Sequence, residues 1–513
     1  MSEVNSNNKR IAKNTLLLYF RMLLIMAVSL YTSRVVLKEL GVDDYGIYNV
    51  VGGVVAMFNI LSGALSAAIS RFITFELGKE NSEKLKKVFS SAITIQIFIA
   101  IIIILLAETF GLWFLNNKMV ISIDRLNAAH WVYQFSIVTF VINLISVPYN
   151  AAIIAHEKMS AFAYIGIIEV INKLGISLAI AISPIDRLIF YGLMLMVVAV
   201  IIRMMYTYYC KKHFEECSEY KFIFDKELFK EMFGFAGWNF IGSSSAVLRD
   251  QGGNILINMF NGPEVNAARG LAMQVSHAIQ VFVANFMTAL NPQITKSYAS
   301  GQYDYMMTLI FQGARLSYYI LLLLSLPVIF NTQYLLSLWL ENVPDHTVVF
   351  VQLILIFAMS ESLASPLVTA MLATGNIRNY QLVVGGLQLL NLPISYVLLR
   401  IGYAPEVIFI VAIFISVCCE MARLYMLRKM IKISVRYFFS QVYFNVIGVT
   451  LIALITPYLF VINSEISFQN FLVCCMICVT STLISIYFIG CDRNDRELIK
   501  KILNNIIKKI KNR

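Results

Sequence analysis

Charged and amide side chains interrupt two stretches of the sequence, 235–260 and 265–290, that are otherwise apolar enough to cross a membrane. A charge at the centre of a bilayer costs about 2.5–3.5 kcal/mol, so such side chains normally face a protein interior or a water-filled cavity. These two stretches are therefore predicted to line a polar conduit, where their side chains could bind an ion or a polar cargo. The side chains concerned are Arg249, Asp250, Gln251, Arg269, His277 and Gln280.

The spacing of the polar residues predicts two helices, each with one polar face, because residues about three, four or seven apart share a face of an α-helix. The first polar face would carry Asn239, Ser243, Asp250 and Asn254. The second would carry Arg269, Met273, Ser276 and Gln280.

Arg249 and Asp250 are neighbours in the sequence, so they point about 100° apart on a helix and are predicted not to pair along it. Each then needs a partner on another helix, in a ligand or in water. A salt bridge that holds one conformation and a substrate or ion site both remain open. Gly252 and Gly253, which follow, weaken the helix and could let it bend there.

Two arginines fall within the first apolar stretch of the chain, 14–37. Arg21, near its middle, shares a helix face with Asn14 and Thr32 and is expected to line a cavity. Arg34 lies nearer the outer end, where a long side chain could also extend to the membrane interface.

Acidic residues within later apolar stretches are candidates for ion coupling. Glu169 precedes Lys173 by four residues, the favourable order for an ion pair within one helix, so a structural pair and a functional role both remain open. Glu361 could carry a coupling proton. Glu420 and Arg423, three residues apart, are interpreted as a pair in the protein interior.

The composition is that of a protein that crosses the membrane many times. Of its 513 residues, 59% are hydrophobic and 14% are charged, with a mean hydropathy of +0.73, whereas a soluble chain carries about 25% charge. The net charge of +11 would suit nucleic acid. However, Lys and Arg gather in alternate loops, as they do on the cytoplasmic side of membrane proteins, so no nucleic-acid partner is expected. Both termini are predicted to be cytoplasmic.

The predicted fold class is an all-α integral membrane protein with about fourteen spanning helices of roughly 20 residues each. We expect a six-helix lobe, a cytoplasmic linker, a second six-helix lobe, two further helices and a basic amphipathic tail on the inner leaflet. The corresponding ranges are 1–209, 210–234, 235–430, 431–490 and 491–513.

The two lobes resemble repeats of one another. Gly41 in LKELGVDDYG corresponds to Gly262 in INMFNGPEVN, and Gly78 corresponds to Gly301. A weaker similarity joins IIAHEKMSAFAY to LATGNIRNYQ. Since each copy covers an even number of spans, the copies would share one orientation and be related by an axis along the membrane normal. Chance similarity between apolar helices is the alternative.

The sequence contains no recognisable catalytic constellation. The five histidines are scattered, and neither a phosphate-binding loop nor metal-ligand spacing is present. We therefore expect no enzymatic activity, no cofactor and no metal site. Arginine outnumbers acidic residues in the predicted conduit, which suits an anionic cargo such as a phosphate or pyrophosphate that guanidinium groups bind in a bidentate manner.

The layout of six, six and two spans resembles the polysaccharide (O-antigen type) flippases, as do LGVDDYGIYNVVGGVV after the first span and NPQITKSYASG at the end of the eighth. These proteins belong to the multidrug/oligosaccharidyl-lipid/polysaccharide exporter superfamily. The resemblance implies two lobes arranged in a V around a central cationic cavity. It also implies transport of undecaprenyl-pyrophosphate-linked oligosaccharide from the inner to the outer leaflet of a bacterial inner membrane, coupled to H⁺ or Na⁺.

The resemblance implies roles for residues chosen by their depth in the membrane rather than by a strict motif. Substrate contacts would come from Arg21, Arg34, Arg249, Arg269 and Gln280. Ion coupling would involve Asp250, Glu361, Glu169 and Lys173. The implied partners, besides the cargo and the ion, are membrane lipids and polysaccharide polymerase or assembly proteins.

Two alternative functions remain. A drug/cation antiporter of the same superfamily would favour an aromatic cavity lined by carboxylates, whereas the predicted conduit is rich in arginine. A membrane-embedded polysaccharide polymerase or ligase would need a large periplasmic loop for its chemistry, and the longest predicted outer loops, 114–126 and 331–346, are short.

Overall fold

The computed structural model describes residues 2–56, 59–118, 121–222, 225–340, 343–462, 465, 467–491 and 496. Throughout this part of the chain the regular structure is helical, so the predicted all-α class is confirmed. Almost all of the predicted basic tail, 491–513, lies outside the described residues. The α-helices are α1 (Ser2–Ala56), α2 (Asn59–Gly78), α3 (Ser82–Leu106), α4 (Leu112–Lys118), α5 (Leu126–Ala155), α6 (Met159–Ala179), α7 (Arg187–His213), α8 (Lys226–Ala299), α9 (Tyr303–Phe330), α10 (Thr332–Trp339), α11 (Thr347–Thr374), α12 (Arg378–Leu389), α13 (Asn391–Ile401), α14 (Val407–Ile431), α15 (Val435–Phe438), α16 (Phe444–Ile462) and α17 (Phe468–Ser485).

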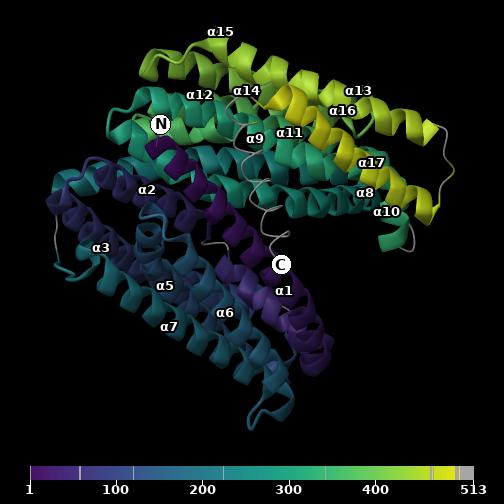
Figure 1. The fold of residues 1–513 in the computed structure, drawn as a ribbon. Helices are drawn as coiled ribbons and strands as arrows, with labels where there is room; N and C mark the ends of the chain where they lie inside the picture. The colour runs from purple at the N-terminus through teal and green to yellow at the C-terminus, as the bar shows by residue number, and fades with distance from the viewer. Residues whose placement is uncertain are drawn as a thin grey trace, which may run out of the picture. The chain divides into compact units, whose positions relative to one another are not determined.

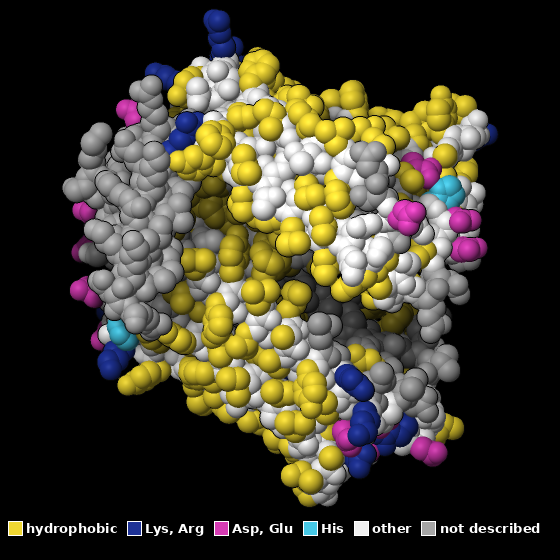
Figure 2. Space-filling view, turned by 45° about the vertical axis from the view of Figure 1, so that its right-hand side comes forward, with side chains coloured by type: hydrophobic (Ala, Val, Ile, Leu, Met, Phe, Trp, Pro, Cys, Tyr) yellow, Lys and Arg dark blue, Asp and Glu magenta, His cyan; other side chains and the backbone are white. Residues whose placement is uncertain are grey.

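The helices are those of a multi-pass membrane protein. Within the described residues, 11 helical segments are long and apolar enough to cross a membrane, and each coincides with a predicted span. The other three predicted spans, 45–72, 235–260 and 265–290, are also helical where described but are richer in small or polar residues. On the face drawn in Figure 2, the exposed side chains are mostly hydrophobic and the charged ones gather towards its edges.

The chain packs as two compact units. The lobes predicted from the sequence have different boundaries from these units and stay a prediction. In unit 1, α5 packs against α7 and α1 packs against α6. In unit 2, α11 packs against α9 and α14, and α16 lies beside α17 (Figure 1). Unit 1 comprises Met1–Ser244, Thr288–Gln302 and Gly375–Arg378, and unit 2 comprises Ser245–Met287, Tyr303–Thr374 and Asn379–Arg513.

The predicted pair Gly41 and Gly262 marks the same backbone break in both repeats. Gly41 in α1 has φ 80° and ψ 169°, and Gly262 in α8 has φ 84° and ψ 178°. A residue with a Cβ atom essentially never adopts this combination of φ and ψ, so the position requires glycine. Two residues 221 positions apart therefore share a conformation that requires glycine, which argues against chance similarity between the repeats.

The second predicted pair, Gly78 with Gly301, is shifted in register. Gly301 has a left-handed backbone with φ 74°, but its counterpart in the first repeat is Glu80, with φ 56°. Two residues later α3 begins at Ser82 and α9 begins at Tyr303. The structure thus pairs Gly301 with Glu80, because the turn geometry depends on a left-handed residue and not on the presence of glycine.

Helices α5 and α11 show the same correspondence at their ends, where the sequence similarity was weaker. Each contains an internal proline, Pro148 in α5 and Pro366 in α11. Nine residues beyond each proline lies a left-handed residue, Glu157 with φ 58° and Gly375 with φ 78°. The repeat therefore extends over these helices.

Side-chain hydrogen bonds join the N-terminal ends of equivalent helices within each unit. In unit 1, Nη1 of Arg125 lies 2.5 Å from Oδ2 of Asp186, and Asp44 binds the same guanidinium. In unit 2, Nδ1 of His346 lies 2.5 Å from Oε1 of Glu406. Each contact joins two helices that are not consecutive in the chain, since α6 separates them in unit 1 and α12 and α13 separate them in unit 2.

Replacing Asp186 with alanine is expected to reduce the free energy of unfolding by about 1–3 kcal/mol, since a helix cap and an ion pair are lost together. Oδ1 of Asp186 accepts hydrogen bonds from the backbone amides of Leu188 and Ile189 at the start of α7. Thermal unfolding of the purified protein in detergent would measure the change. Asp124→Ala is the control, because Asp124 precedes Arg125 in the sequence but has an exposed side chain, and it should leave stability unchanged.

The contribution of Asp186 should depend on pH. Burial alone would raise the pKa of this carboxyl, but hydrogen bonds from Arg125 and from the backbone of α7 outweigh burial and lower it below 3.8. The stabilisation is therefore present above pH 3.8 and is lost as the pH falls through the lower pKa of the folded state. A difference between wild type and Asp186→Ala that stayed constant down to pH 2 would contradict this account.

Candidate functional site

Arg269 is the most deeply buried of the predicted substrate-binding arginines. It lies in the second half of α8, in unit 2, with 5% of its surface exposed. Its Nη1 donates to Oδ1 of Asn254, and its guanidinium carbon lies 5.9 Å from the centroid of the Phe409 ring. Within the described part of the chain no acidic side chain forms a salt bridge with Arg269, although Asp250 is close enough to attract it. The site thus holds a buried cation whose hydrogen-bonded partner is neutral.

Arg249 approaches the same site from the first half of α8. Its guanidinium carbon lies 5.0 Å from the centroid of the Phe357 ring of α11, and it is close enough to Arg269 for the two charges to repel. Nε of Arg249 lies 3.0 Å from Oδ1 of Asp250. The prediction that these neighbours cannot pair along their own helix is therefore wrong. The arginine side chain is long enough to fold back around the helix, although the two Cβ atoms point in different directions.

Gly252 and Gly253 are helical and provide space for neighbouring side chains. The helix continues through both residues, and α8 departs from helical geometry only at Gly262. A Cβ atom on Gly253 would lie 3.0 Å from Nη2 of Arg269, and a Cβ atom on Gly252 would overlap the side chain of Leu392. The helix is unbroken at these two glycines, and the missing side chain at Gly253 leaves room for a guanidinium group.

Gln280 lies away from the two arginines. It is eleven residues beyond Arg269 on the same helix, or about 16 Å at the rise of an α-helix. The side chain of Gln280 is exposed and donates through Nε2 to Oγ of Ser276, at 2.7 Å. On this helix face Gln280 is bonded to Ser276 and not to Arg269.

A second polar cluster lies between α11 and α14 of unit 2. Oγ of Ser416 donates to Oε1 of Glu361 at 2.6 Å. Glu420 and Arg423 are both buried, with 1% and 3% of their surfaces exposed, so their interior location is confirmed, but among the described residues no salt bridge joins them as the expected pair. Polar atoms of both remain without a hydrogen-bond partner among the described residues, so this interior is polar enough to take up water or a cation.

The remaining predicted residues belong to unit 1. The guanidinium carbon of Arg21 lies 4.4 Å from the Phe162 ring centroid on α6, and Arg21 occupies the space that a side chain at Gly166 would take. Arg34 is exposed on α1. Glu169 and Lys173 pair at 2.6 Å within α6, as the favourable spacing predicted.

Glu157, between α5 and α6, is a buried carboxylate that the analysis of the sequence did not single out. Arg10, Gln293 and Lys296 contact its two carboxylate oxygens at 2.8, 2.5 and 2.9 Å. The signal that could have found it is the similarity between IIAHEKMSAFAY and LATGNIRNYQ, since Glu157 takes the position that Gly375 takes in the second repeat.

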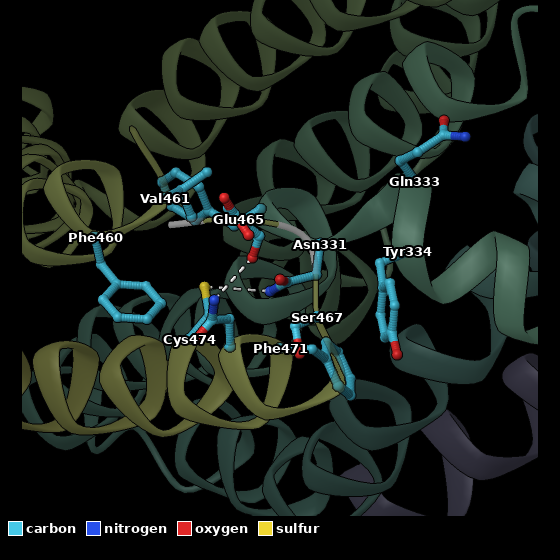
Figure 3. Close-up of a pocket in the computed structure, with 11 residues that line it drawn as sticks. Asn331, Gln333, Tyr334, Phe460, Val461, Glu465, Ser467, Phe471 and Cys474 are labelled. Atoms are coloured by element: carbon cyan, nitrogen blue, oxygen red, sulfur yellow. Dashed lines mark hydrogen bonds between the residues drawn. The ribbon is translucent and has the colours of Figure 1, made fainter. Parts of the chain in front are cut away.

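A pocket of about 160 Å³ lies in unit 2 where α9, α10, α16 and α17 end or begin (Figure 3). Aromatic rings and amide side chains line it, and its lining contains one charged side chain, Glu465. Nδ2 of Asn331 donates to the Pro327 carbonyl at 2.9 Å and to Sγ of Cys474 at 3.3 Å. These bonds hold the amide in place and tie α9 to α17. The pocket is formed by residues other than those of the arginine site.

Solved structures of transporters share this fold at low sequence identity. An outward-facing multidrug resistance MATE transporter of the MOP superfamily matches with a TM-score of 0.69 and 11% identity, over 83% of this chain and 96% of that one. A Vibrio cholerae MATE transporter in a bent form matches with a TM-score of 0.69 and 15% identity, over 86% and 100%. A Pyrococcus furiosus transporter of the MOP superfamily, described as having a binding pocket of reverse polarity, matches with 0.67 and 11%, over 82% and 96%.

Two family models match the sequence itself. The model described as "Polysaccharide biosynthesis protein" matches residues 11–298, and the MatE model matches residues 251–397. No curated protein sequence matches the chain. Because the first match spans more than half of the chain, this protein belongs to the polysaccharide biosynthesis protein family, with the fold of MATE transporters of the MOP superfamily.

Proposed function

We propose that the protein is a flippase that moves undecaprenyl-pyrophosphate-linked oligosaccharide from the inner to the outer leaflet of a bacterial inner membrane. Transport would proceed by alternating access, with both termini in the cytoplasm. Membership of a polysaccharide biosynthesis family supports the cargo, and the fold shared with transporters supports the reaction. The observation that carries the proposal is the buried guanidinium of Arg269, whose hydrogen-bonded partner is the neutral Asn254.

A pyrophosphate group would meet the chemical needs of this site. Burial of a cation without an anion costs several kcal/mol, which the charge of a bound phosphate would offset. Arg269 and Arg249 present two planar guanidinium groups, each able to bind one phosphate in a bidentate manner. The rings of Phe357 and Phe409 lie 5.0 and 5.9 Å from these groups, and such apolar surroundings strengthen charge-assisted hydrogen bonds.

Asp250 competes with an anionic cargo, because it already pairs with Arg249 at 3.0 Å. Replacing Asp250 with asparagine keeps the shape of the side chain but removes its charge. We therefore expect Asp250→Asn to bind inorganic pyrophosphate about 5–10-fold more tightly, a change of about 1–1.4 kcal/mol. Titration calorimetry on the purified protein would measure it. Weaker binding by this variant would show instead that Asp250 positions Arg249 for the cargo.

Glu361 is the residue that we propose for ion coupling. It faces Ser416 in the polar interior between α11 and α14, where Glu420 is also buried. A carboxylate beside a hydroxyl can bind either a proton or a sodium ion. Asp250 remains a second candidate, whereas Glu169 and Lys173 already neutralise each other within α6. In unit 1 the proposed cargo contacts are Arg21 and the exposed Arg34, and in unit 2 Gln280 is an exposed candidate.

The proposal is tested by the sidedness of the cargo in inner-membrane vesicles from a deletion strain. Lipid-linked oligosaccharide should accumulate on the cytoplasmic face and should reach the periplasmic face when the wild-type protein is supplied. If unpolymerised units gather on the periplasmic face in the deletion strain, transport is intact without the protein, and a polymerase or ligase role takes precedence.

A drug/cation antiporter is the second candidate, because the MatE model matches residues 251–397 and a buried carboxylate, that of Glu420, lies in unit 2. The two functions require opposite charges on the cargo. Binding of a cationic dye that is lost in Glu420→Gln but kept in Arg269→Gln would favour the antiporter.

A further inference from the structure

Five polar residues meet where the last turn of α8 reaches the turn between α5 and α6. We call them the Glu157 network, and all of them belong to unit 1. Oε2 of Glu157 contacts Nε of Arg10 at 2.8 Å and Nε2 of Gln293 at 2.5 Å, and Oε1 contacts Nζ of Lys296 at 2.9 Å. Nδ2 of Asn14 donates to the backbone carbonyl of Glu157 at 3.3 Å. One carboxylate with only 2% of its side chain exposed is thus held by groups from two other helices.

The backbone of Glu157 indicates that this position is under constraint. Its φ of 58° is left-handed, a conformation that costs a residue with a side chain about 1–3 kcal/mol. The equivalent residue of the second repeat is Gly375, which adopts the same backbone without that cost. A strained glutamate persists at this position because its carboxylate is held by the network.

The contacts in this region join the two repeats crosswise. Glu157 belongs to the first repeat and binds α8 of the second. In turn, Arg71 on α2 of the first repeat lies over Gly375 of the second, so that a Cβ atom there would be 2.5 Å from Nη2 of Arg71. Gly78 lets α2 approach α8, since a Cβ atom there would lie 2.8 Å from that of Ala299.

An apolar layer lies about one helical turn from the network. Leu18, Met159 and Ala289 form a fully buried cluster that joins α1, α6 and α8. Leu18 is four residues beyond Asn14, and Ala289 is four residues before Gln293, so each lies one turn along its helix. At this end of unit 1 a buried apolar cluster thus lies next to the Glu157 network.

We propose that the Glu157 network is a latch that holds the C-terminal turn of α8 closed against α1 and the α5–α6 turn, and that it must open before the repeats separate at this end. The charges of Glu157, Arg10 and Lys296 explain how the latch stays closed. With the carboxylate present, Arg10 and Lys296 are both attracted to it; without it, two cations face each other. The carboxylate is buried, whereas the side chains of Arg10 and Lys296 are 48% and 26% exposed, so removal of its charge leaves both cations without the anion that holds them at this turn. The inference concerns the opening of the protein and does not depend on the identity of its cargo.

The test uses the purified full-length protein in detergent, without substrate. Ala289→Cys places a thiol in the apolar layer, and mass spectrometry of the peptide that carries it measures its rate of maleimide labelling separately from the native cysteines. Adding Glu157→Gln, which keeps the size of the side chain, should speed labelling about tenfold, the factor given by a 1.4 kcal/mol shift of the closed–open equilibrium. Hydrogen exchange of the peptide 288–302 should rise in parallel in Glu157→Gln alone.

Glu80→Gln is the matched control, because Glu80 is also a glutamate with a left-handed backbone but is exposed. It should leave both rates unchanged. If Glu157→Gln does not fold, a charge swap provides the test. Lys296→Glu alone should speed the labelling of Ala289→Cys, and adding Glu157→Lys should slow the labelling again. Unchanged labelling and exchange in folded Glu157→Gln would overturn the proposal, as would a lower melting temperature with no change in either rate, which describes a purely structural cluster.

Discussion

Arg269→Gln is expected to abolish the appearance of lipid-linked oligosaccharide on the periplasmic face of inner-membrane vesicles. Arg269 is the buried cation of the candidate site, and glutamine keeps its ability to donate a hydrogen bond to Asn254 while removing the charge. Truncating one partner of a buried charge-assisted contact costs about 2–5 kcal/mol. Binding of pyrophosphate should therefore weaken by roughly 100-fold, which corresponds to about 2.7 kcal/mol.

Two further variants separate charge from geometry at this position. Arg269→Lys keeps the charge but cannot form two parallel hydrogen bonds, so its loss of affinity should be smaller, about tenfold. Arg400→Gln removes an exposed arginine of α13, also in unit 2, and should leave binding and transport unchanged. Wild-type transport by a correctly folded Arg269→Gln protein would remove the anion site from the proposal.

Gly375→Ala is expected to lower the melting temperature more than any other single addition of a methyl group at a left-handed glycine of the described chain. The added Cβ would adopt an unfavourable backbone conformation with φ 78° and would also lie 2.5 Å from Nη2 of Arg71. The backbone term is about 1–2 kcal/mol. Displacing a guanidinium packed against Phe72 and Phe75 should bring the total to about 2–4 kcal/mol.

Gly301→Ala isolates the backbone term, because Gly301 has φ 74° and nothing within 4 Å of its would-be Cβ. The loss of stability in Gly375→Ala minus that in Gly301→Ala, measured by thermal unfolding, is the cost of moving the Arg71 side chain away from the added methyl group. If Gly375→Ala and Gly301→Ala lose the same stability, Arg71 moves aside freely and the crossed contact with the second repeat is weak.

The membrane-spanning helices followed from the sequence because their causes are local. Each span needs only a run of apolar residues long enough for the bilayer. Likewise, the break at Gly41 and Gly262 needs only a residue without a side chain, and the pair Glu169–Lys173 needs only a spacing of four. Such features depend on neighbours along the chain, so the sequence contains what decides them.

The details of the repeat and of the arginine site depended on more than local pattern. Gly301 is paired with Glu80, and a glutamate in the sequence does not predict a left-handed backbone. Arg249 pairs with its own neighbour, because packing against Phe357 determines which way a long flexible side chain turns. The absence of a side chain at Gly253 matters only in the folded protein, where the guanidinium group of Arg269 lies against it.

By itself, the sequence determined that this protein is an all-α membrane protein built from two repeats, with arginines at depths where a charge must find a partner. Only the tertiary structure decided which partners these are. Glu157 meets Asn14, Gln293 and Lys296 across 143, 136 and 139 residues of chain. Contacts of this kind come from the packing of whole helices, and the free energy of each depends on burial that no stretch of sequence specifies alone.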